Sequence, residues 1–478
     1  MNSKELAFKP AIELRELIAK KEISPVELTQ IYLDRIDKLD NKLNSFITII
    51  PDQAIKDAKK AEKAILDNKP LGKLHGLPIS IKDLESTQNI KTTMGSLVFK
   101  EKVPEFDSIV VERIRNSGAI ILGKTNTPEF GLLGSTENRL GKSDWQNHCR
   151  NPWNTEMTTG GSSGGAAAAI SSALCSLATG SDGGGSIRIP ASYCGVYGIK
   201  PTLGTIPRYP GVPTPPIANQ TSQAGPITRS VRDSIMLLNV LSGHDKRDPI
   251  SLKVNPDNIL NLNHINIDNM RIGWVDHFGF GQIDNEVTSI CRKAFDLLQE
   301  HMGNADMVEI DGGSPFEAFW TLFSTNVYTS YRKLFESKQC TLTWYTQKCL
   351  EYGASVSGSD YAHALGEVDV LKSKFSSIFE KFDLVFTPTT AVPAFPVGNP
   401  PTTINGIQVN EFWGAFPNTF PINMIGYPAA SIPCGFTKNK LPVGLHIIGK
   451  PNAEAAILAA SLKLESISPW IQNHPPIS

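Results

Sequence analysis

Apolar residues recur at helical spacing along the N-terminal part of the chain. Residues 24–27, Ser-Pro-Val-Glu, combine an N-cap serine, a proline at the first helical position and a capping-box glutamate, and helical spacing continues to Leu39. The first 67 residues carry this pattern throughout. We therefore expect residues 1–70 to form a set of N-terminal helices.

From Leu77 the pattern changes to short apolar runs that alternate with amphipathic ones. Alternation of this kind is typical of a sheet with helices on its faces, so the chain is predicted to be α/β. The strand-like runs are 77–83, 119–123, 174–180, 271–275, 383–387 and 443–449, and the helix-like runs are 107–118, 229–241, 284–302 and a last one from Asn452.

No repeat, charge run or low-complexity stretch divides the chain, which favours one domain over two. The Pro-rich stretch from Pro201 to Pro226 is the best candidate for a linker. Because it lies between Gly/Ser motifs and further α/β elements, we interpret it as a long surface loop.

The composition argues against several classes of partner. Lys and Arg number 46 against 47 Asp and Glu, so the chain has no general field for nucleic acid, and no basic patch is evident. The N-terminus lacks the apolar stretch of a signal peptide, and no apolar run reaches the roughly 18 residues that span a bilayer. The seven cysteines form no CxxC pair, which predicts free thiols. We expect a cytoplasmic protein with no membrane, nucleic-acid or metal partner.

A formal Walker A match at Gly118–Thr125 raises the question of nucleotide binding. Its four variable positions, 119–122, read Ala-Ile-Ile-Leu, the pattern of a buried strand rather than of a loop that offers N–H groups to phosphates. A P-loop follows its strand, whereas this match contains one. We interpret the match as coincidence.

Residues 160–164, Gly-Gly-Ser-Ser-Gly, match the G-x-S-x-G elbow of α/β-hydrolases. That elbow needs a strand directly before it, and the preceding NPWNTEMTT is polar and rich in threonine. A hydrolase triad also needs a downstream histidine, and His446 lies in a strand pattern, where a lone histidine is more often structural. The elbow interpretation therefore fails on its context.

Two Gly/Ser clusters remain, at 160–165 and 181–186. An Ala-rich helix pattern and a strand pattern lie between them, so a flexible linker is a poor explanation. Glycines are required where backbone N–H groups approach a ligand closely, and successive N–H groups can point at one oxyanion. The second cluster has this form, with Ser186 as candidate nucleophile after Gly183, Gly184 and Gly185.

Lys82 ends one of the predicted strands, HGLPISIKD. Ser80 and Lys82 share one face of that strand, and its other face is apolar. Lysines in such places more commonly extend to solvent. At the ordinary pKa of about 10.4 only about 0.04% of an amine is neutral at pH 7, so a lysine base needs a pKa near 7, which burial can supply.

Taken together, these residues resemble the amidase signature family of serine hydrolases. The resemblance covers nearly the whole chain and is strongest over residues 75–233, with HGLPISIKD, GGSSGG and SDGGGSIRIPASYCGVYGIKPT; it resumes at DLVFTPT, NMIGYPAASIPCGF and LPVGLHIIG. In the last motif the family usually has glutamine in place of His446. The resemblance implies a central mixed, twisted β-sheet covered by helices on both faces. It also implies one domain over 1–478, with a signature core at 71–240 and the remainder at 241–478.

The catalytic roles are likewise implied by the resemblance. Ser186 would be the nucleophile, Ser162 the bridging serine on a cis peptide, and Lys82 the base that takes a proton from Ser162. The expected reaction is hydrolysis of a small-molecule amide by water through an acyl-enzyme, without cofactor or metal, in a monomer or homodimer. The N–H groups of Gly183, Gly184 and Gly185 would form the oxyanion hole, and Ser163, Asp182 and Arg188 would support the site.

Substrate choice in this family resides outside the signature core, and here the region of about 311–365 stands out. Eleven residues from Gly312 to Tyr361 are aromatic, well above the 8% of the whole chain. The helical spacing of Phe316, Trp320 and Phe323 favours packed core over pocket lining. Any of them that lined the site would favour an aryl or apolar amide. Carbamates and esters stay open as substrates, because the same acyl transfer handles them.

The alternative is the glutaminase component of a tRNA-dependent glutamyl or aspartyl amidotransferase complex. Such glutaminases hold the amino and carboxylate groups of glutamine with an acidic residue and an arginine in the C-terminal third. Here GAFPNTFPI lacks the acid, and LKSKFSSIFEKFD carries no arginine. A free-standing amidase is therefore the preferred prediction.

Overall fold

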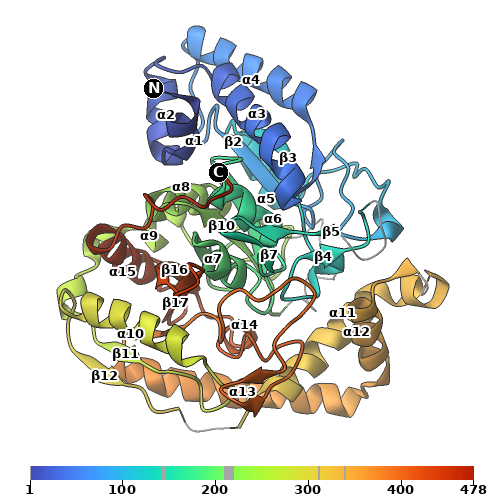
Figure 1. Ribbon diagram of the computed structural model, residues 1–478, viewed down its shortest axis with the longest axis vertical. Helices are drawn as coiled ribbons and strands as arrows, with labels where there is room; N and C mark the ends of the chain where they lie inside the picture. Colours follow the sequence, from blue (N-terminus) through green and yellow to red (C-terminus); the bar gives the residue numbers. More distant parts are fainter. Residues whose placement is uncertain (1, 142–146, 209–219, 311–312, 339–340) are drawn as a thin grey trace.

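The centre of the molecule is an eleven-stranded sheet (Figure 1). The computed structural model describes residues 2–141, 147–208, 220–310, 313–338 and 341–478. In spatial order the strands are β1 (Phe46–Ile49), β3 (Ile120–Thr125), β2 (Pro78–Lys82), β8 (Leu177–Asp182), β10 (Gln223–Thr228), β9 (Tyr197–Lys200), β16 (Ala429–Phe436), β17 (Pro442–Gly449), β13 (Leu384–Pro388), β11 (Ile272–Trp274) and β12 (Ala305–Met307).

The sheet is mixed, as expected. Strands β3, β2 and β8 run parallel to one another, and so do β13, β11 and β12. The strands between these two blocks pair antiparallel, as does β1 at the edge. Three further two-stranded sheets are β4 (Glu137–Asn138) with β5 (Asn147–His148), β6 (Arg150–Asn151) with β7 (Asn154–Thr158), and β14 (Thr403–Ile404) with β15 (Ile407–Gln408).

Helices cover both faces of the central sheet, which confirms the predicted fold class (Figure 1). Within the described ranges no helix is long and apolar enough to cross a membrane. The α-helices are α1 (Ser3–Phe8), α2 (Ala11–Ala19), α3 (Pro25–Leu43), α4 (Pro51–Leu66), α5 (Ile109–Asn116), α6 (Gly164–Ser171), α7 (Arg188–Cys194), α8 (Val231–Leu241), α9 (Pro256–Ile259), α10 (Asn285–Gln299), α11 (Phe316–Lys338), α12 (Trp344–Ser355), α13 (Gly358–Lys381), α14 (Phe420–Met424) and α15 (Glu454–Ile467).

The N-terminal segment is not entirely helical, so that expectation is wrong at β1. Asn44 adopts the left-handed conformation with φ 52° and ends α3, and Pro51 begins α4. Between them, Phe46–Ile49 carries the aromatic and β-branched residues that strands favour. These four residues form an edge strand because β3 offers a backbone partner, which a local pattern cannot show.

The expected surface loop from Pro201 to Pro226 ends in a buried strand instead. Residues 209–219 of that stretch lie outside the described part. All six residues of β10 are buried, and β10 lies between β8 and β9 in the sheet. Pro226 has no N–H to donate to a neighbouring strand. The pairing of β10 with β9 starts only at Ile227, so Pro226 is paired on one side only, with β8.

The segment before the first Gly/Ser cluster forms a strand, contrary to the interpretation of NPWNTEMTT as unsuited to one. That strand, β7, pairs with β6 in a separate two-stranded sheet and not in the central one. A nucleophile elbow requires a strand of the central sheet at this place. The structure therefore has no nucleophile elbow at this place. The reason is that the preceding strand belongs to another sheet, and not that its residues are unsuited to a strand.

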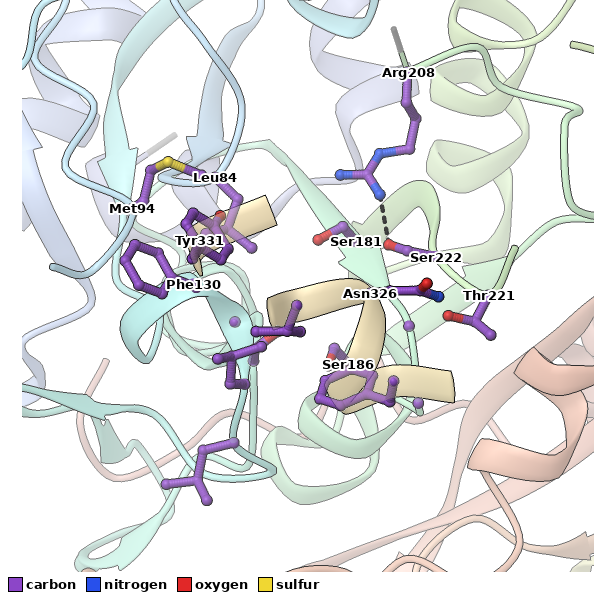
Figure 2. Close-up of a pocket in the computed structure, with 18 of the residues that line it drawn as sticks. Leu84, Met94, Phe130, Ser181, Ser186, Arg208, Thr221, Ser222, Asn326 and Tyr331 are labelled. Atoms are coloured by element: carbon purple, nitrogen blue, oxygen red, sulfur yellow. Dashed lines mark hydrogen bonds between the residues drawn. The ribbon is translucent and has the colours of Figure 1, made fainter. Parts of the chain in front are cut away.

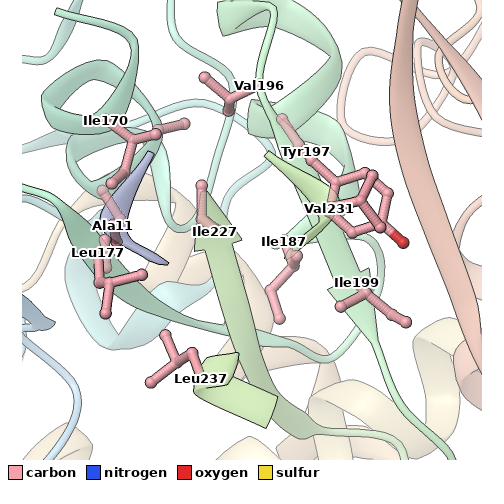
Figure 3. Close-up of a cluster of buried hydrophobic side chains, with 14 of the residues drawn as sticks. Ala11, Ile170, Leu177, Ile187, Val196, Tyr197, Ile199, Ile227, Val231 and Leu237 are labelled. Atoms are coloured by element: carbon pink, nitrogen blue, oxygen red, sulfur yellow. The ribbon is translucent and has the colours of Figure 1, made fainter. Parts of the chain in front are cut away.

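Part of the hydrophobic core gathers residues of β8, β9 and β10 and of helices that pack on them (Figure 3). Ile170 of α6, Leu177 of β8, Ile227 of β10, Ile199 of β9 and Leu237 of α8 are all fully buried there. Full burial of such a side chain contributes about 1.5–3 kcal/mol each. The helix that begins in the first cluster, α6, and the strand that runs into the second, β8, are thus both anchored in the hydrophobic core.

Candidate active site

Lys82 lies at the end of β2 with its side chain fully buried. Its Nζ lies 2.8 Å from Ser162 Oγ and 2.8 Å from Ser163 Oγ, and it donates to the Ser181 carbonyl oxygen at 3.3 Å. Burial, and next the positive charge of Arg208, hold the pKa of the Lys82 amine well below its usual range. The amine is thus placed and tuned to accept a proton from a serine hydroxyl.

The first Gly/Ser cluster brings Ser162 to that amine. The peptide bond between Gly161 and Ser162 is cis, as the resemblance implied. A Cβ on Gly161 would lie 2.7 Å from the backbone of Ser135, so only glycine allows this close approach of two loops. Helix α6 begins directly after Ser163. The loop is therefore held between a neighbouring loop on one side and a helix on the other.

The second cluster is a turn built around the Asp182 carboxylate. Asp182 ends β8, and its carboxylate accepts from the N–H groups of Gly185 at 2.7 Å and Ile187 at 3.1 Å. Arg188 adds two bonds of 2.9 Å from Nε and Nη2. Burial alone would raise the pKa of Asp182, but the adjacent Arg188 guanidinium holds it well below its usual range. Asp182 therefore stays ionised and fixes the turn that carries Ser186.

A socket of glycines in three neighbouring strands anchors the residue after Ser186. Ile187 is fully buried, and a Cβ on Gly180, Gly198 or Gly225 would lie within 2.9 Å of its side chain. These glycines belong to β8, β9 and β10, which lie side by side. Replacing any of them would force Ile187 and the turn outward.

Ser186, Gly183 and Gly184 line a cavity of about 130 Å³, whereas Gly185, expected to share the oxyanion hole, does not. Gly185 N–H is engaged by Asp182, whereas the N–H groups of Gly183 and Gly184 contact no acceptor among the described residues. The Ser186 hydroxyl likewise has no hydrogen-bond partner in the described part of the chain, and Ser186 is 9% exposed. Ser162 lines the same cavity. A ligand in this cavity can thus contact both serines and two backbone donors.

We predict that Gly185→Ala strongly destabilises the protein. Gly185 has φ 128°, and an added Cβ would lie 2.6 Å from Ile189 Cδ1 and from Thr419 Oγ1. Backbone strain and overpacking together should lower the free energy of unfolding by about 2–4 kcal/mol, measured by chemical denaturation.

The matched control is Gly366→Ala, in the exposed part of α13. An added Cβ there meets nothing within 4 Å, so this change should raise the free energy of unfolding by about 0.5–1 kcal/mol. Equal effects of the two substitutions would contradict the constraint at Gly185.

The cavity wall has an apolar and a polar side (Figure 2). The apolar side includes Leu84, Met94, Phe130 and Tyr331, which gather together in the view, and also Trp413. The aromatic region of about 311–365 contributes through α11: two of its aromatics, Phe323 and Tyr331, line the cavity. Others pack elsewhere, such as Tyr345, whose hydroxyl donates to the Glu137 carbonyl oxygen. Residues 311–312 and 339–340 lie outside the described part.

The polar side contains residues that the sequence did not single out. These are Arg208, Thr221, Ser222 and Asn326, which lie there beside Ser181 of the second Gly/Ser cluster. Arg208 follows β9 in the Pro-rich stretch, where a lone arginine carries no motif. Asn326 lies on α11, about 140 residues after Ser186 in sequence. Only the tertiary fold brings them to the two serines.

Three lysines are fully buried in the described structure: Lys82, Lys124 and Lys200. Lys124, from the formal Walker A match, donates to the Glu85 carbonyl oxygen and the Thr87 and Thr92 hydroxyls. Burial lowers the pKa of Lys124 to about 8 and that of Lys200 to about 7. A lowered pKa therefore does not identify a base, but of the three only Lys82 contacts a serine that lines the cavity.

His446 also has a structural environment. It is fully buried on β17, and its Nε2 lies 3.0 Å from Arg188 Nη1. Burial, and next the charge of Arg188, hold the pKa of His446 well below its usual range, so it stays neutral and accepts from Arg188. It belongs to the support of the turn and does not line the cavity.

Comparison with known proteins gives consistent matches over nearly the whole chain. A family model described as Amidase matches residues 27–458. An acylamidase of Rhodococcus erythropolis is 30% identical over 99% of this chain and 98% of its own. One of the subunits of the glutamyl-tRNA(Gln) amidotransferase of Thermosynechococcus vestitus is 34% identical over 97% of this chain and 99% of its own. The crystal structure of a bacterial aryl acylamidase superposes with a TM-score of 0.89 at 29% identity, covering 97% of each chain.

Proposed function

Since the chain belongs to the amidase signature family and is an amide-hydrolysing enzyme, we propose that it works as a free-standing hydrolase of aryl or other apolar amides. The observation that carries the proposal is the buried Lys82 amine 2.8 Å from Ser162 Oγ, beside a cavity that Ser162 and Ser186 both line.

The proposed reaction starts with two proton transfers. The neutral Lys82 amine takes the proton of Ser162, Ser162 takes that of Ser186, and Ser186 Oγ attacks the amide carbonyl carbon. The N–H groups of Gly183 and Gly184 would bind the oxyanion that forms. The amide nitrogen receives the proton back through Ser162 as the C–N bond breaks, leaving an acyl ester on Ser186. Water, deprotonated by the same relay, then releases the carboxylic acid.

The chemistry of the cavity supports an apolar substrate. Most of its lining side chains are apolar, and no acidic residue is among the described residues that line it. Among the described residues that line the cavity, the charged one is Arg208. Its Nη2 lies 3.3 Å from the Glu85 carboxylate. The ammonium group of free glutamine would therefore find no partner of opposite charge. This favours the hydrolysis of apolar amides over the hydrolysis of glutamine by an amidotransferase glutaminase.

The test is hydrolysis by the purified chain alone of a panel with aliphatic and aryl 4-nitroanilides, an aryl carbamate, an aryl ester and free glutamine. We expect kcat/KM for the best anilide to exceed that for glutamine by at least about 10²-fold, because an apolar pocket leaves the charges of glutamine desolvated. Preference for glutamine, or activity that appears only with added partner proteins, would overturn the proposal. A preference for the carbamate or ester would redefine the acyl group and keep the mechanism.

A further inference from the structure

The polar side of the cavity is close to neutral in charge. Arg208 is 7% exposed, and its Nη2 lies 3.3 Å from the Glu85 carboxylate, while its Nη1 donates to Ser222 Oγ (Figure 2). The arginine charge is thus balanced inside the wall. A substrate carboxylate placed here would add an uncompensated charge to a buried site, next to the oxyanion that forms at Ser186. An uncharged polar group does not meet this cost.

Asn326 offers that side of the cavity a fixed hydrogen-bond donor. The Tyr361 hydroxyl, on α13, donates to Asn326 Oδ1 at 3.0 Å, which orients the carboxamide and occupies one lone pair of its oxygen. The amide nitrogen, Nδ2, contacts no acceptor among the described residues, although Asn326 lines the cavity. In the view of Figure 2 the end of its side chain lies between Ser222 and Thr221. The Asn326 amide group, oriented by the Tyr361 hydroxyl and with its N–H groups unpaired among the described residues, can donate to an acceptor atom of a ligand.

We propose that Asn326 Nδ2 binds a second, uncharged carbonyl oxygen of the substrate. The preferred substrate is then an amide that carries, besides an apolar group, a ketone, amide or ester carbonyl a few atoms from the scissile bond. This rests on the proposed amide hydrolysis. Tyr361 is a positioning residue, because it acts on the substrate only through the orientation of Asn326.

The test uses two series of matched compounds, one for each side of the scissile bond. The acyl series is the anilides of 4-oxopentanoic and pentanoic acid and the monoanilide of succinic acid. The amine series is N-(3-oxobutyl)benzamide, N-butylbenzamide and N-benzoyl-β-alanine. Within each series the chain length is constant, and only the distal group changes from neutral carbonyl to methylene to carboxylate. We expect the ketone to exceed both partners in kcat/KM by about 10–100-fold in at least one series.

The variants link the preference to Asn326. In Asn326→Leu the ratio of ketone to methylene compound should fall to about 1, and in Asn326→Asp, which presents oxygens in place of the donor, below 1. Tyr361→Phe should reduce the ratio several-fold, which a loss of stability alone would not do. Thr329→Ala, on the exposed face of α11, serves as control and should keep the wild-type ratio.

The outcomes separate the two proposals. Equal hydrolysis of ketone and methylene compounds, a preference for the carboxylates, or a preference that persists in Asn326→Leu overturns the inference about Asn326 alone. Failure to hydrolyse any of the six compounds, together with the 4-nitroanilides, overturns this inference and the proposed function together.

Discussion

Ser186→Ala is expected to lower kcat/KM for the best 4-nitroanilide by at least about 10⁴-fold, because it removes the atom that forms the acyl ester in the proposed mechanism. Ser186 lines the cavity, and its hydroxyl has no competing hydrogen bond among the described residues. A fluorophosphonate should add to the wild-type protein at one site, which peptide mass spectrometry should place on Ser186. The same reagent should leave the variant unlabelled.

The control is Ser171→Ala, at the end of α6. The Ser171 hydroxyl donates to the Cys194 carbonyl oxygen at 2.8 Å and lies away from the cavity, so this variant should lose only about 1 kcal/mol of stability and keep its activity. Activity that survives Ser186→Ala, or fluorophosphonate adducts found only on another residue, would remove Ser186 as the nucleophile.

Lys82→Met is expected to lower kcat/KM by about 10²–10⁴-fold, the usual contribution of a general base. Methionine fills a similar volume but leaves the hydroxyls of Ser162 and Ser163 without the amine that now contacts both. Fluorophosphonate labelling of Ser186 should slow in parallel. If labelling kept its wild-type rate, Lys82 would not act on the nucleophile.

The pH dependence of the wild-type enzyme follows from the lowered pKa of Lys82. A base is active when unprotonated, so kcat/KM should rise with pH through the pKa of Lys82 and level off above it. Since burial, and next Arg208, hold that pKa well below its usual range, the plateau should be reached well below pH 10. A profile that rises only above pH 10 would show that Lys82 keeps an ordinary pKa.

The lowered pKa of Lys82 also makes the free energy of unfolding depend on pH, and this dependence can be measured without an activity assay. Between the folded and unfolded pKa values of Lys82 the unfolded chain binds more protons, so this group makes the folded state more stable as pH rises. Lys82→Met removes that contribution. The difference in unfolding free energy, variant minus wild type, should therefore fall as pH rises, measured by denaturation at several pH values. A difference that is constant with pH would contradict a buried, neutral Lys82.

The elements that the sequence predicted correctly are those whose pattern is local. The helix cap at Ser24, the helix-like run 229–241 that forms α8, the apolar runs of β2, β3 and β8, and the amphipathic α10 all appear where the pattern placed them. The failures are β1, expected within a helical segment, and β7 and β10, whose polar or proline residues are typical of loops; each of the three pairs with a strand partner that its own sequence pattern does not reveal. At these strands, pairing within a sheet overrides the local preference of the residues for other structure. Pro226, in particular, made the sequence of β10 look like that of a loop.

The sequence by itself determined the chemical groups of this site. Glycines, serines and one lysine at fixed spacings carry the motif, because a turn that presents backbone N–H groups needs glycine at particular positions. The tertiary structure decided what those groups can do. It buried Lys82 against Ser162, engaged Gly185 N–H with Asp182, and closed the cavity with Arg208, Asn326 and Trp413. Proton affinity and substrate fit depend on distance and on exclusion of water, which belong to the folded chain and not to any segment of it.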